Sequence, residues 1–323
     1  MHLVTGGTGF LGAYVVRDLL TTGQRVAVYD LHPDAEQLAL TAGPDSADAV
    51  TIVRGDTADG AALEQAAGDL GAEVIVHLAS PVPPDSERDA SDCLRHITQA
   101  QINVLESARK LGTKRVVWAS ALSVFGTPDD HGGPEQCLPH DAPHFPRSLY
   151  GIAKSANERL ARLYWERYGV DSLGFRFGQG YGPGKRRGSA FSFRMFEAAL
   201  TGKAFALPYG DDVINWQYGD DMAALLVAAC TAGGLRPGTS YNTMGDLRPM
   251  REAACVLQDL APTARIDIEP GRADLCWRLA SDAPADAPKL AFATPIEAGF
   301  ARTLETLRRW ATDKVPNGPG TAP

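Results

Sequence analysis

A tyrosine and a lysine four positions apart, Tyr150 and Lys154, are the residues of this sequence best suited to catalysis. A spacing of i and i+4 puts both side chains on one face of a helix. Removing a hydride from an alcohol carbon requires loss of the hydroxyl proton, so a base must lie near the alcohol. A neighbouring ammonium group favours the phenolate form of tyrosine, whose ordinary pKa is about 10. We therefore predict that Tyr150 is the acid–base group and that Lys154 assists it.

A glycine-rich motif, TGGTGFLG, lies between a β-rich run and an amphipathic helix near the start of the chain. Gly6 would permit the tight turn, Gly9 the close approach of a pyrophosphate, and Gly12 the close packing of helix and strand. The helix N-terminus would supply N–H groups to the anion. The motif therefore predicts a dinucleotide site that includes Gly6, Gly9, Phe10, Leu11 and Gly12.

An acidic residue, Asp30, ends the second β-rich run, at the spacing where a carboxylate accepts hydrogen bonds from the ribose hydroxyls of a dinucleotide. A 2′-phosphate at this position would meet a like charge. Leu31 and His32 follow, with no Lys or Arg adjacent. The cofactor that we expect is therefore NAD and not NADP.

The order of these motifs resembles the extended short-chain dehydrogenase/reductases, the NAD-dependent epimerase/dehydratase family, over nearly the whole chain. That family has T-G-x-x-G-x-x-G near its N-terminus and P-x-S-x-Y-G at the catalytic tyrosine, and PRSLYG stands here. The resemblance implies that Asp56, followed by Thr57, contacts the adenine amino group. It also implies a strand end that lines the cofactor and a helix asparagine that supports the site, here Leu78, Ala79, Ser80 and Asn103.

The sequence departs from the family at the Ser or Thr that normally completes the catalytic pair, because the corresponding position is Ala121. Ser120 or Ser123 could take over through a local shift, with Ser123 favoured because it lies two positions away. Alternatively, Tyr150 and the backbone hold the substrate oxygen, or the chemistry is weakened. Strand alternation places the serines differently from Ala121, so neither replacement is assured.

The substrate-binding motifs also resemble the family with substitutions. RFGQGYGPG matches R-x-x-N-x-Y-G-P with Gln179 in place of asparagine, and NWQYGDD matches D-F-V-Y-V-D-D but follows Ile214 instead of an arginine. Such an arginine clamps a diphosphate, so its loss weakens the case for a nucleotide sugar. The basic run at 185–187 or Arg272 could compensate, and we expect Gln179, Arg187 and Arg272 to bind substrate.

The reaction expected from these motifs is NAD-dependent hydride transfer at a secondary hydroxyl or ketone of a small, sugar-like substrate, with an acidic group or a linked nucleotide both open. An epimerase would return the hydride to the same molecule, whereas a dehydrogenase would release NADH. Net oxidation of a small hydroxy acid or alcohol is one alternative. A non-catalytic NAD-binding sensor or scaffold is another, motivated by Ala121.

The elements that must position these residues alternate between β-rich and helical runs, which is typical of a parallel sheet with helical crossovers. We predict an α/β fold, a Rossmann-like doubly wound parallel sheet with a smaller C-terminal substrate-binding lobe. The expected strands are residues 2–5, 25–30, 50–54, 74–79, 114–119, 170–175 and 240–243. The expected helices are residues 11–22, 61–70, 91–111, 149–168, 190–200, 220–231 and 296–312.

The expected domain division follows the change toward glycine- and proline-rich segments near residue 178. Residues 1–177 would form the NAD-binding domain, with segments near 212–245 returning to it. Residues 178–314 would form most of the substrate-binding lobe, and 315–323 a flexible tail. A homodimer through the two long helices is expected from the resemblance.

Composition narrows the partners further. The 323 residues carry 31 Lys plus Arg against 39 Asp plus Glu, and a net charge of −8 disfavours nucleic acid. No apolar run approaches the ~18 residues of a membrane helix, and the first strand follows the initial methionine directly, so we expect a cytoplasmic protein without a membrane partner. Five scattered cysteines argue for reduced thiols. The irregular spacing of His131, Cys137, His140, Asp141 and His144 argues against a metal.

Overall fold

The fold was analysed in a computed structural model of the 323-residue chain. It describes residues 1–133, 136–273, 278–279, 288–290, 292 and 294–313. The tail predicted at 315–323 lies outside the described residues. Among those described, no helix combines the length and the hydrophobicity needed to cross a membrane.

A seven-stranded sheet in the order β11-β7-β5-β4-β1-β2-β3 forms the centre of the larger lobe, and every neighbouring pair is parallel. From β1 the chain builds outward first on one side and then on the other, which confirms the predicted doubly wound sheet. Its strands are β1 (His2–Thr5), β2 (Val26–Asp30), β3 (Thr51–Arg54), β4 (Val74–His77), β5 (Arg115–Ala121), β7 (Ser172–Phe177) and β11 (Thr239–Asn242).

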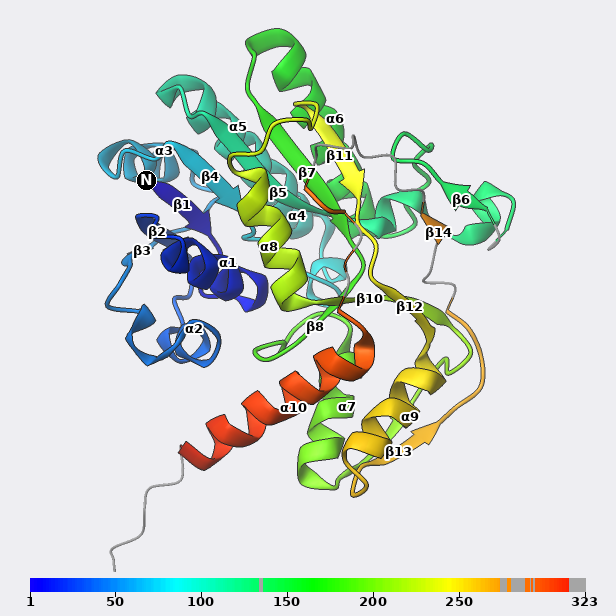
Figure 1. The fold of residues 1–323 in the computed structure, drawn as a ribbon. Helices are drawn as coiled ribbons and strands as arrows, with labels where there is room; N and C mark the ends of the chain where they lie inside the picture. Colours follow the sequence, from blue (N-terminus) through cyan, green and yellow to red (C-terminus); the bar gives the residue numbers. More distant parts are fainter. Residues whose placement is uncertain (134–135, 274–277, 280–287, 291, 293, 314–323) are drawn as a thin grey trace, which may run out of the picture.

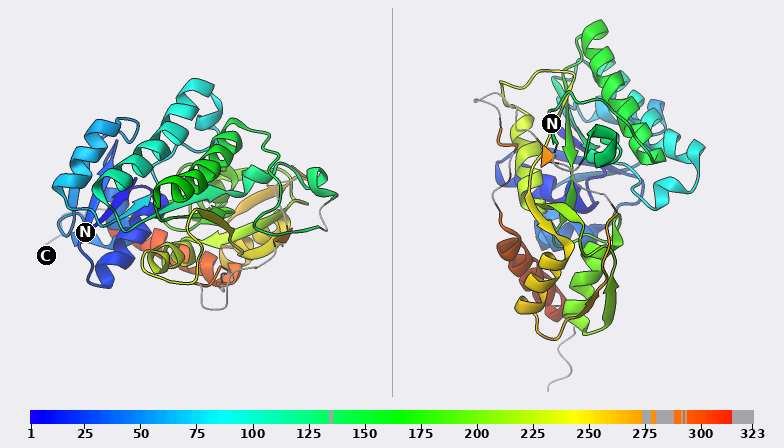
Figure 2. Two further views of the ribbon diagram at one scale, coloured as in Figure 1. Left: turned by 90° about the horizontal axis from the view of Figure 1, so that it is seen from above. Right: turned by 90° about the vertical axis from the view of Figure 1, so that its right-hand side faces the viewer.

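Helices cover both faces of this sheet (Figures 1 and 2). On one face α1 (Phe10–Thr21) packs against α8 (Gly219–Ala229). On the other lie α3 (Gly60–Asp69), α5 (Ala100–Leu111) and α6 (Leu149–Tyr168). Parallel strands covered on both faces are buried along their whole length and are therefore mainly apolar, as in β1 and β4, where every residue is buried.

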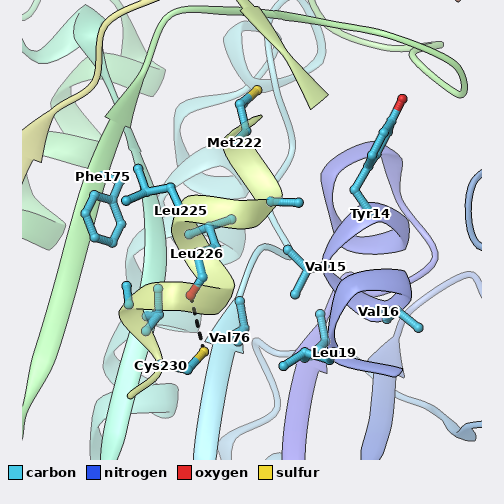
Figure 3. Packing of buried hydrophobic residues seen from close by; sticks show 14 of the residues in the cluster. Tyr14, Val15, Val16, Leu19, Val76, Phe175, Met222, Leu225, Leu226 and Cys230 are labelled. Atoms are coloured by element: carbon cyan, nitrogen blue, oxygen red, sulfur yellow. Dashed lines mark hydrogen bonds between the residues drawn. The ribbon is translucent and has the colours of Figure 1, made fainter. Parts of the chain in front are cut away.

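The core on the α1 and α8 side shows how distant segments join (Figure 3). Leu226 of α8 and Val15 of α1 are fully buried there with Val76 of β4. The segment 219–229 comes from the second half of the chain. It packs on the seven-stranded sheet because its apolar side chains cover apolar side chains of the strands on that face.

The helical run at 90–111 differs from the single helix that the sequence predicted. It consists of α4 (Ala90–Leu94), a π-helical turn (Arg95–Gln99) and α5. A π turn adds one residue to the helical repeat and is frequent at functional sites. Here it includes His96, whose side chain reaches the cleft described below.

The smaller lobe has its own core, with Trp216 and Phe300 packed edge to face at 5.8 Å between ring centres. Below the sheet in Figure 1 it contains β8 (Gln179–Tyr181), α7 (Ala190–Thr201), β9 (Ala204–Leu207), β10 (Val213–Tyr218), β12 (Asp246–Pro249), α9 (Met250–Leu260), β13 (Arg265–Ile268) and α10 (Ile296–Asp313). The remaining elements are α2 (Ala35–Ala42) and the pair β6 (Cys137–Leu138) and β14 (Arg278–Leu279). The strands that the sequence missed lie outside the regular alternation of strand and helix from which the other strands were predicted.

Candidate active site

A cleft of about 1050 Å³ runs past the carboxyl ends of the sheet strands into the smaller lobe. Ligands of open α/β sheets bind at this edge, where the strand order reverses. The predicted site residues that line it are Gly6, Gly9, Phe10, Leu11, Gly12, Asp30, Asp56, Thr57, Leu78, Ala79, Ser80, Ser120, Ser123, Tyr150, Lys154, Gln179 and Arg187. Asn103 and Arg272, also predicted, are not among the lining residues.

The glycine turn has the close packing that a dinucleotide site requires. A Cβ on Gly12 would lie 2.1 Å from the carbonyl oxygen of Gly6, which itself has a φ of +67°. The first N–H groups of a helix have no partner within it, and no side chain caps the following helix, which begins at Phe10. Backbone N–H groups at an uncapped helix start fit the pyrophosphate of NAD.

The carboxylate of Asp30 is held in the turn by hydrogen bonds that it accepts from neighbouring residues. One oxygen, Oδ2, accepts from the backbone N (3.1 Å) and from Oγ1 (2.7 Å) of Thr8, and Oδ1 accepts from the backbone N of His32 at 3.1 Å. The carboxylate is partly exposed and lines the cleft. A fixed negative charge at this point fits ribose hydroxyls and repels a phosphate.

Asp56 and Thr57 line the cleft, whereas Asn103 lies behind them. The amide Nδ2 of Asn103 donates to the carbonyl oxygen of Thr57 at 2.9 Å, and its Oδ1 accepts from Gln99 at 2.9 Å. Asn103 is therefore a support for the loop after β3 and has no place in the lining of the cleft. The sequence motif indicated a role for this asparagine near the site, but it did not indicate that Asn103 lies behind the residues that line the cleft.

The end of β4 is joined to β1 through Thr5. Its Oγ1 lies 2.7 Å from Nδ1 of His77 and accepts from the backbone N of Leu78 (3.2 Å) and Ala79 (3.3 Å). Burial lowers the pKa of His77 to about 3, so this imidazole is neutral at physiological pH. His77 is therefore a packed strand residue and not an acid or base.

Tyr150 and Lys154 lie on the first two turns of α6, whose start is capped twice. Ser148 Oγ accepts from the backbone N of Gly151 at 3.0 Å, and the Glu87 carboxylate accepts from the backbone N of Tyr150 at 3.0 Å. The Nζ of Lys154 donates to the carbonyl oxygen of Ala119 at 2.8 Å and lies 5.4 Å from the centre of the Tyr150 ring. The helix therefore sets the phenol and the ammonium side by side against β5.

Burial dominates the ionisation of this pair in the ligand-free protein. It raises the pKa of Tyr150, and Cys93 nearby adds to this effect. It also lowers the pKa of Lys154 to about 8. The direction for Tyr150 is opposite to that expected from the lysine alone, because removing the phenol from water disfavours its charged form. Tyr150 is therefore protonated before a ligand binds.

The two serines beside Ala121 have different surroundings. The hydroxyl of Ser120, in β5, donates to Glu158 Oε1 at 2.6 Å. Ser123 lies beyond the strand in a 3-10 turn (Leu122–Phe125), so the alternation of a strand does not extend to it. Its Oγ is buried without a hydrogen-bond partner among the described residues, and Ser123 lines the cleft. Of these two serines, Ser123 is the one whose hydroxyl is not committed to a partner among the described residues.

A buried ion pair lies directly behind Ser120. Glu158 accepts from Arg176 through both oxygens, with Nε to Oε1 at 2.9 Å and Nη2 to Oε2 at 2.6 Å. Arg176 also donates to the carbonyl oxygen of His140 (2.6 Å) and to Asn242 Oδ1 (3.0 Å). A charge-assisted bidentate pair fixes α6, β7 and the loop before α6 in one arrangement.

The histidines of that loop have structural partners. His131 Nε2 contacts the carbonyl oxygen of Phe125 at 2.9 Å, and His144 Nδ1 contacts Ser155 Oγ at 2.9 Å. Burial lowers the pKa of His144. Across the part of the chain that the structure describes, no three His, Cys, Asp or Glu side chains gather in a way that could hold a metal ion.

The substrate end of the cleft lies between the two lobes. Gln179, at the start of β8, donates through Nε2 to Ser192 Oγ at 3.0 Å. Ile214 lines this end at the position where the family motif has an arginine, and Ala273 lines it next to Arg272, which was expected there. The sequence named Lys185 only as part of the basic run at 185–187 and gave His96 and Arg147 no role in the site, although all three line the cleft. A cation directly after a glycine–proline turn was the available signal for Lys185.

Comparison with known proteins agrees with this geometry. The family described as NAD dependent epimerase/dehydratase family matches residues 2–243. The D-erythronate dehydrogenase of Cupriavidus necator is 31% identical over 272 residues, covering 78% of this chain and 81% of that protein. A probable dTDP-glucose 4,6-dehydratase of Sinorhizobium fredii is 25% identical over 277 residues, with 81% and 77% covered.

Among solved structures, the dTDP-glucose 4,6-dehydratase DesIV of Streptomyces venezuelae, determined with NAD bound, superposes with a TM-score of 0.79. It is 26% identical, and the match covers 95% of this chain and 97% of that one. Three independent features therefore agree: the family motifs, the doubly wound sheet and the cleft at the glycine turn. This chain is an enzyme of the NAD-dependent epimerase/dehydratase family, with NAD as its cofactor.

Proposed function

We propose that this protein transfers a hydride between NAD and a secondary hydroxyl or ketone of an anionic, sugar-like substrate. The observation that carries the proposal is the convergence of Tyr150, Lys154 and the free hydroxyl of Ser123 on one cleft beside the glycine turn. A non-catalytic NAD sensor would not need a phenol, an ammonium and an unpartnered hydroxyl at one place.

In the proposed mechanism NAD, when bound, supplies the acceptor of the hydride and a positive charge near Tyr150. The Tyr150 phenolate accepts the hydroxyl proton as the carbon–hydrogen bond breaks and the carbonyl forms, and in the reverse direction the phenol returns it. Lys154 stabilises the phenolate by its charge. Ser123 Oγ donates a hydrogen bond to the reacting oxygen, where negative charge develops.

The charges along the cleft support an anionic substrate. The acidic side chains that line it are Asp30, Asp34, Asp56 and Asp92, all from the cofactor-binding half. The cationic ones are Arg147, Lys154, Lys185, Arg186 and Arg187, around the catalytic pair and the smaller lobe. Arg147 pairs with Asp130 and Arg186 with Asp34, and no ion pair engages Lys154, Lys185 or Arg187 among the described residues. The part of a cleft where charges of one sign predominate attracts ligands of the opposite sign.

A specific observation favours net oxidation of a small hydroxy acid over chemistry on a nucleotide sugar. Ile214 lines the cleft at the position before NWQYGDD, where an arginine would clamp a diphosphate. The next side chain, Asn215, is directed inward, with Nδ2 donating to the carbonyl oxygen of Thr243 at 3.1 Å. Similarity to a D-erythronate dehydrogenase supports the same choice.

The substitution Tyr150→Phe tests the catalytic role. Loss of the acid–base group should lower kcat by about 10²–10⁴-fold without changing the Kd for NAD, since the ring remains. Steady-state kinetics and calorimetry measure the two quantities. Unchanged turnover would contradict the assignment. Because burial raises the pKa of Tyr150, oxidation should become faster toward alkaline pH, where the phenolate fraction grows, while reduction should not.

The pair Ser123→Ala and Ser120→Ala separates the two serines. Loss of the free hydroxyl in Ser123→Ala should lower kcat/KM by about 10²-fold and leave stability unchanged. The matched control Ser120→Ala removes a donor to buried Glu158 and should lower the free energy of unfolding by about 1–3 kcal/mol with nearly normal kcat/KM. Kinetics and urea denaturation measure both; the reverse pattern would assign the role to Ser120.

Cofactor retention distinguishes a dehydrogenase from an epimerase. If the enzyme catalyses net oxidation, desalting should remove NAD, and a panel of aldonates such as D-erythronate with added NAD should generate NADH absorbance at 340 nm. Retention of NAD through desalting, together with interconversion of sugar nucleotides without net NADH, would instead indicate an epimerase.

We also propose a homodimer, supported by exposed apolar side chains on helices that pack together, α4 and α6. Leu94 is 44% and Ile152 47% exposed in the single chain, and such side chains commonly gather at interfaces. Ile152→Lys should convert a dimer to a monomer in sedimentation equilibrium. The control Leu247→Lys changes an exposed leucine of β12 and should not; a wild-type monomer would refute the proposal.

A further inference from the structure

Lys185 carries a charge in the cleft that has no counter-ion. It follows the turn Gly182-Pro183-Gly184 after β8, and its backbone N donates to the carbonyl oxygen of Gly182 at 3.2 Å. The next residue, Arg186, reaches Asp34 Oδ2 at 3.4 Å. Among the described residues, in contrast, no carboxylate lies within ion-pair distance of Lys185 Nζ, and burial alone lowers the pKa of this lysine, to about 8.

The turn before Lys185 belongs to the smaller lobe but is fixed to the cofactor-binding half. The phenol of Tyr14, in α1, donates to the carbonyl oxygen of Pro183 at 3.1 Å. The amide Nε2 of Gln37, in α2, donates to the carbonyl oxygen of Gly184 at 2.9 Å. Gly184 has a φ of +85°, and a Cβ there would lie 2.1 Å from Gln37 Nε2. Lys185 is therefore held at the junction of the two lobes.

The ammonium group of Lys185 is close to the glycine turn. Its Nζ lies 5.1 Å from the centre of the Phe10 ring, and Phe10 is the first residue of α1. An attraction of this kind offsets only part of the cost of burying a charge without a counter-ion. Because Lys185 lines the cleft, a ligand there can supply the missing negative charge.

We propose that Lys185 Nζ binds an anionic group of the ligand that fills this cleft. Phosphate and carboxylate have the chemistry required, and two sources are within reach of the junction: the pyrophosphate of NAD at the turn, and the acidic group of the substrate. The substrate source rests on the proposed function, whereas the NAD source does not. In either case Lys185 ties the smaller lobe to a bound ligand.

The test compares Lys185→Met, which removes the charge, with Lys185→Arg, which keeps it. The control is Lys203→Met, an exposed lysine of the same lobe that lies 3.8 Å from Glu197. Calorimetry measures Kd for NAD and for adenosine on each protein, and then Kd for D-erythronate and UDP on the NAD-loaded protein. Thermal melting shows that each variant is folded, and Lys185→Gln replaces the Met variant if that one is not.

If the pyrophosphate is the partner, Lys185→Met should raise the Kd for NAD at least tenfold, a loss of about 1.4 kcal/mol of binding free energy. The Kd for adenosine should then stay unchanged. If the substrate is the partner, the substitution should instead raise the Kd for D-erythronate or UDP on the NAD-loaded protein. Lys185→Arg should retain most of the affinity. Unchanged Kd for NAD and for both anionic probes overturns the proposal, as does an equal loss for adenosine or in Lys203→Met. An NAD effect in a protein that oxidises no alcohol would support Lys185 while refuting the proposed function.

Discussion

The packing of α6 against the carboxyl end of β5 is the contact on which the rest of the active site depends. One turn of the helix places Lys154 Nζ on the carbonyl oxygen of Ala119, and the next places Glu158 on Ser120 and Arg176. Breaking a buried ion pair by removing one partner typically costs about 3–5 kcal/mol, because the other charge is left uncompensated. Tyr150 and Lys154 are therefore oriented by a helix that a buried ion pair holds in place.

That contact also accounts for the different surroundings of the two serines beside Ala121, where the sequence departs from the family motif. The serine before Ala121 is committed to the ion pair, so it cannot also hold a substrate oxygen. The chain then leaves the strand in a 3-10 turn, and this turn carries Ser123 to the cleft with an unpartnered hydroxyl. A hydroxyl two residues later can serve the same purpose, because the change from strand to turn alters the direction of the side chains.

The two halves of the molecule meet around the glycine turn. Tyr14 and Gln37 bind the turn after β8, and this joins a substrate-lobe segment to helices of the cofactor half. The acidic side chains of the cleft come from the half that contains the glycine turn, while the cations come from residues 147–154 and 185–187. The cleft thus extends from the glycine turn and Asp30 at one side to a group of cationic side chains at the other.

The sequence by itself determined the doubly wound sheet, the glycine turn with Asp30, and the pairing of Tyr150 with Lys154, because each depends on residues close together in the chain. Periodicity and local spacing record such features directly. Only the tertiary structure decided that Ser120 faces Glu158, that Asn103 supports Thr57 from behind, that Arg272 lies outside the lining of the cleft, and that Lys185 lacks a counter-ion. These outcomes depend on partners 38 residues away for Ser120 and 46 for Asn103. No local pattern encodes such distant contacts, since they arise when separate elements pack together.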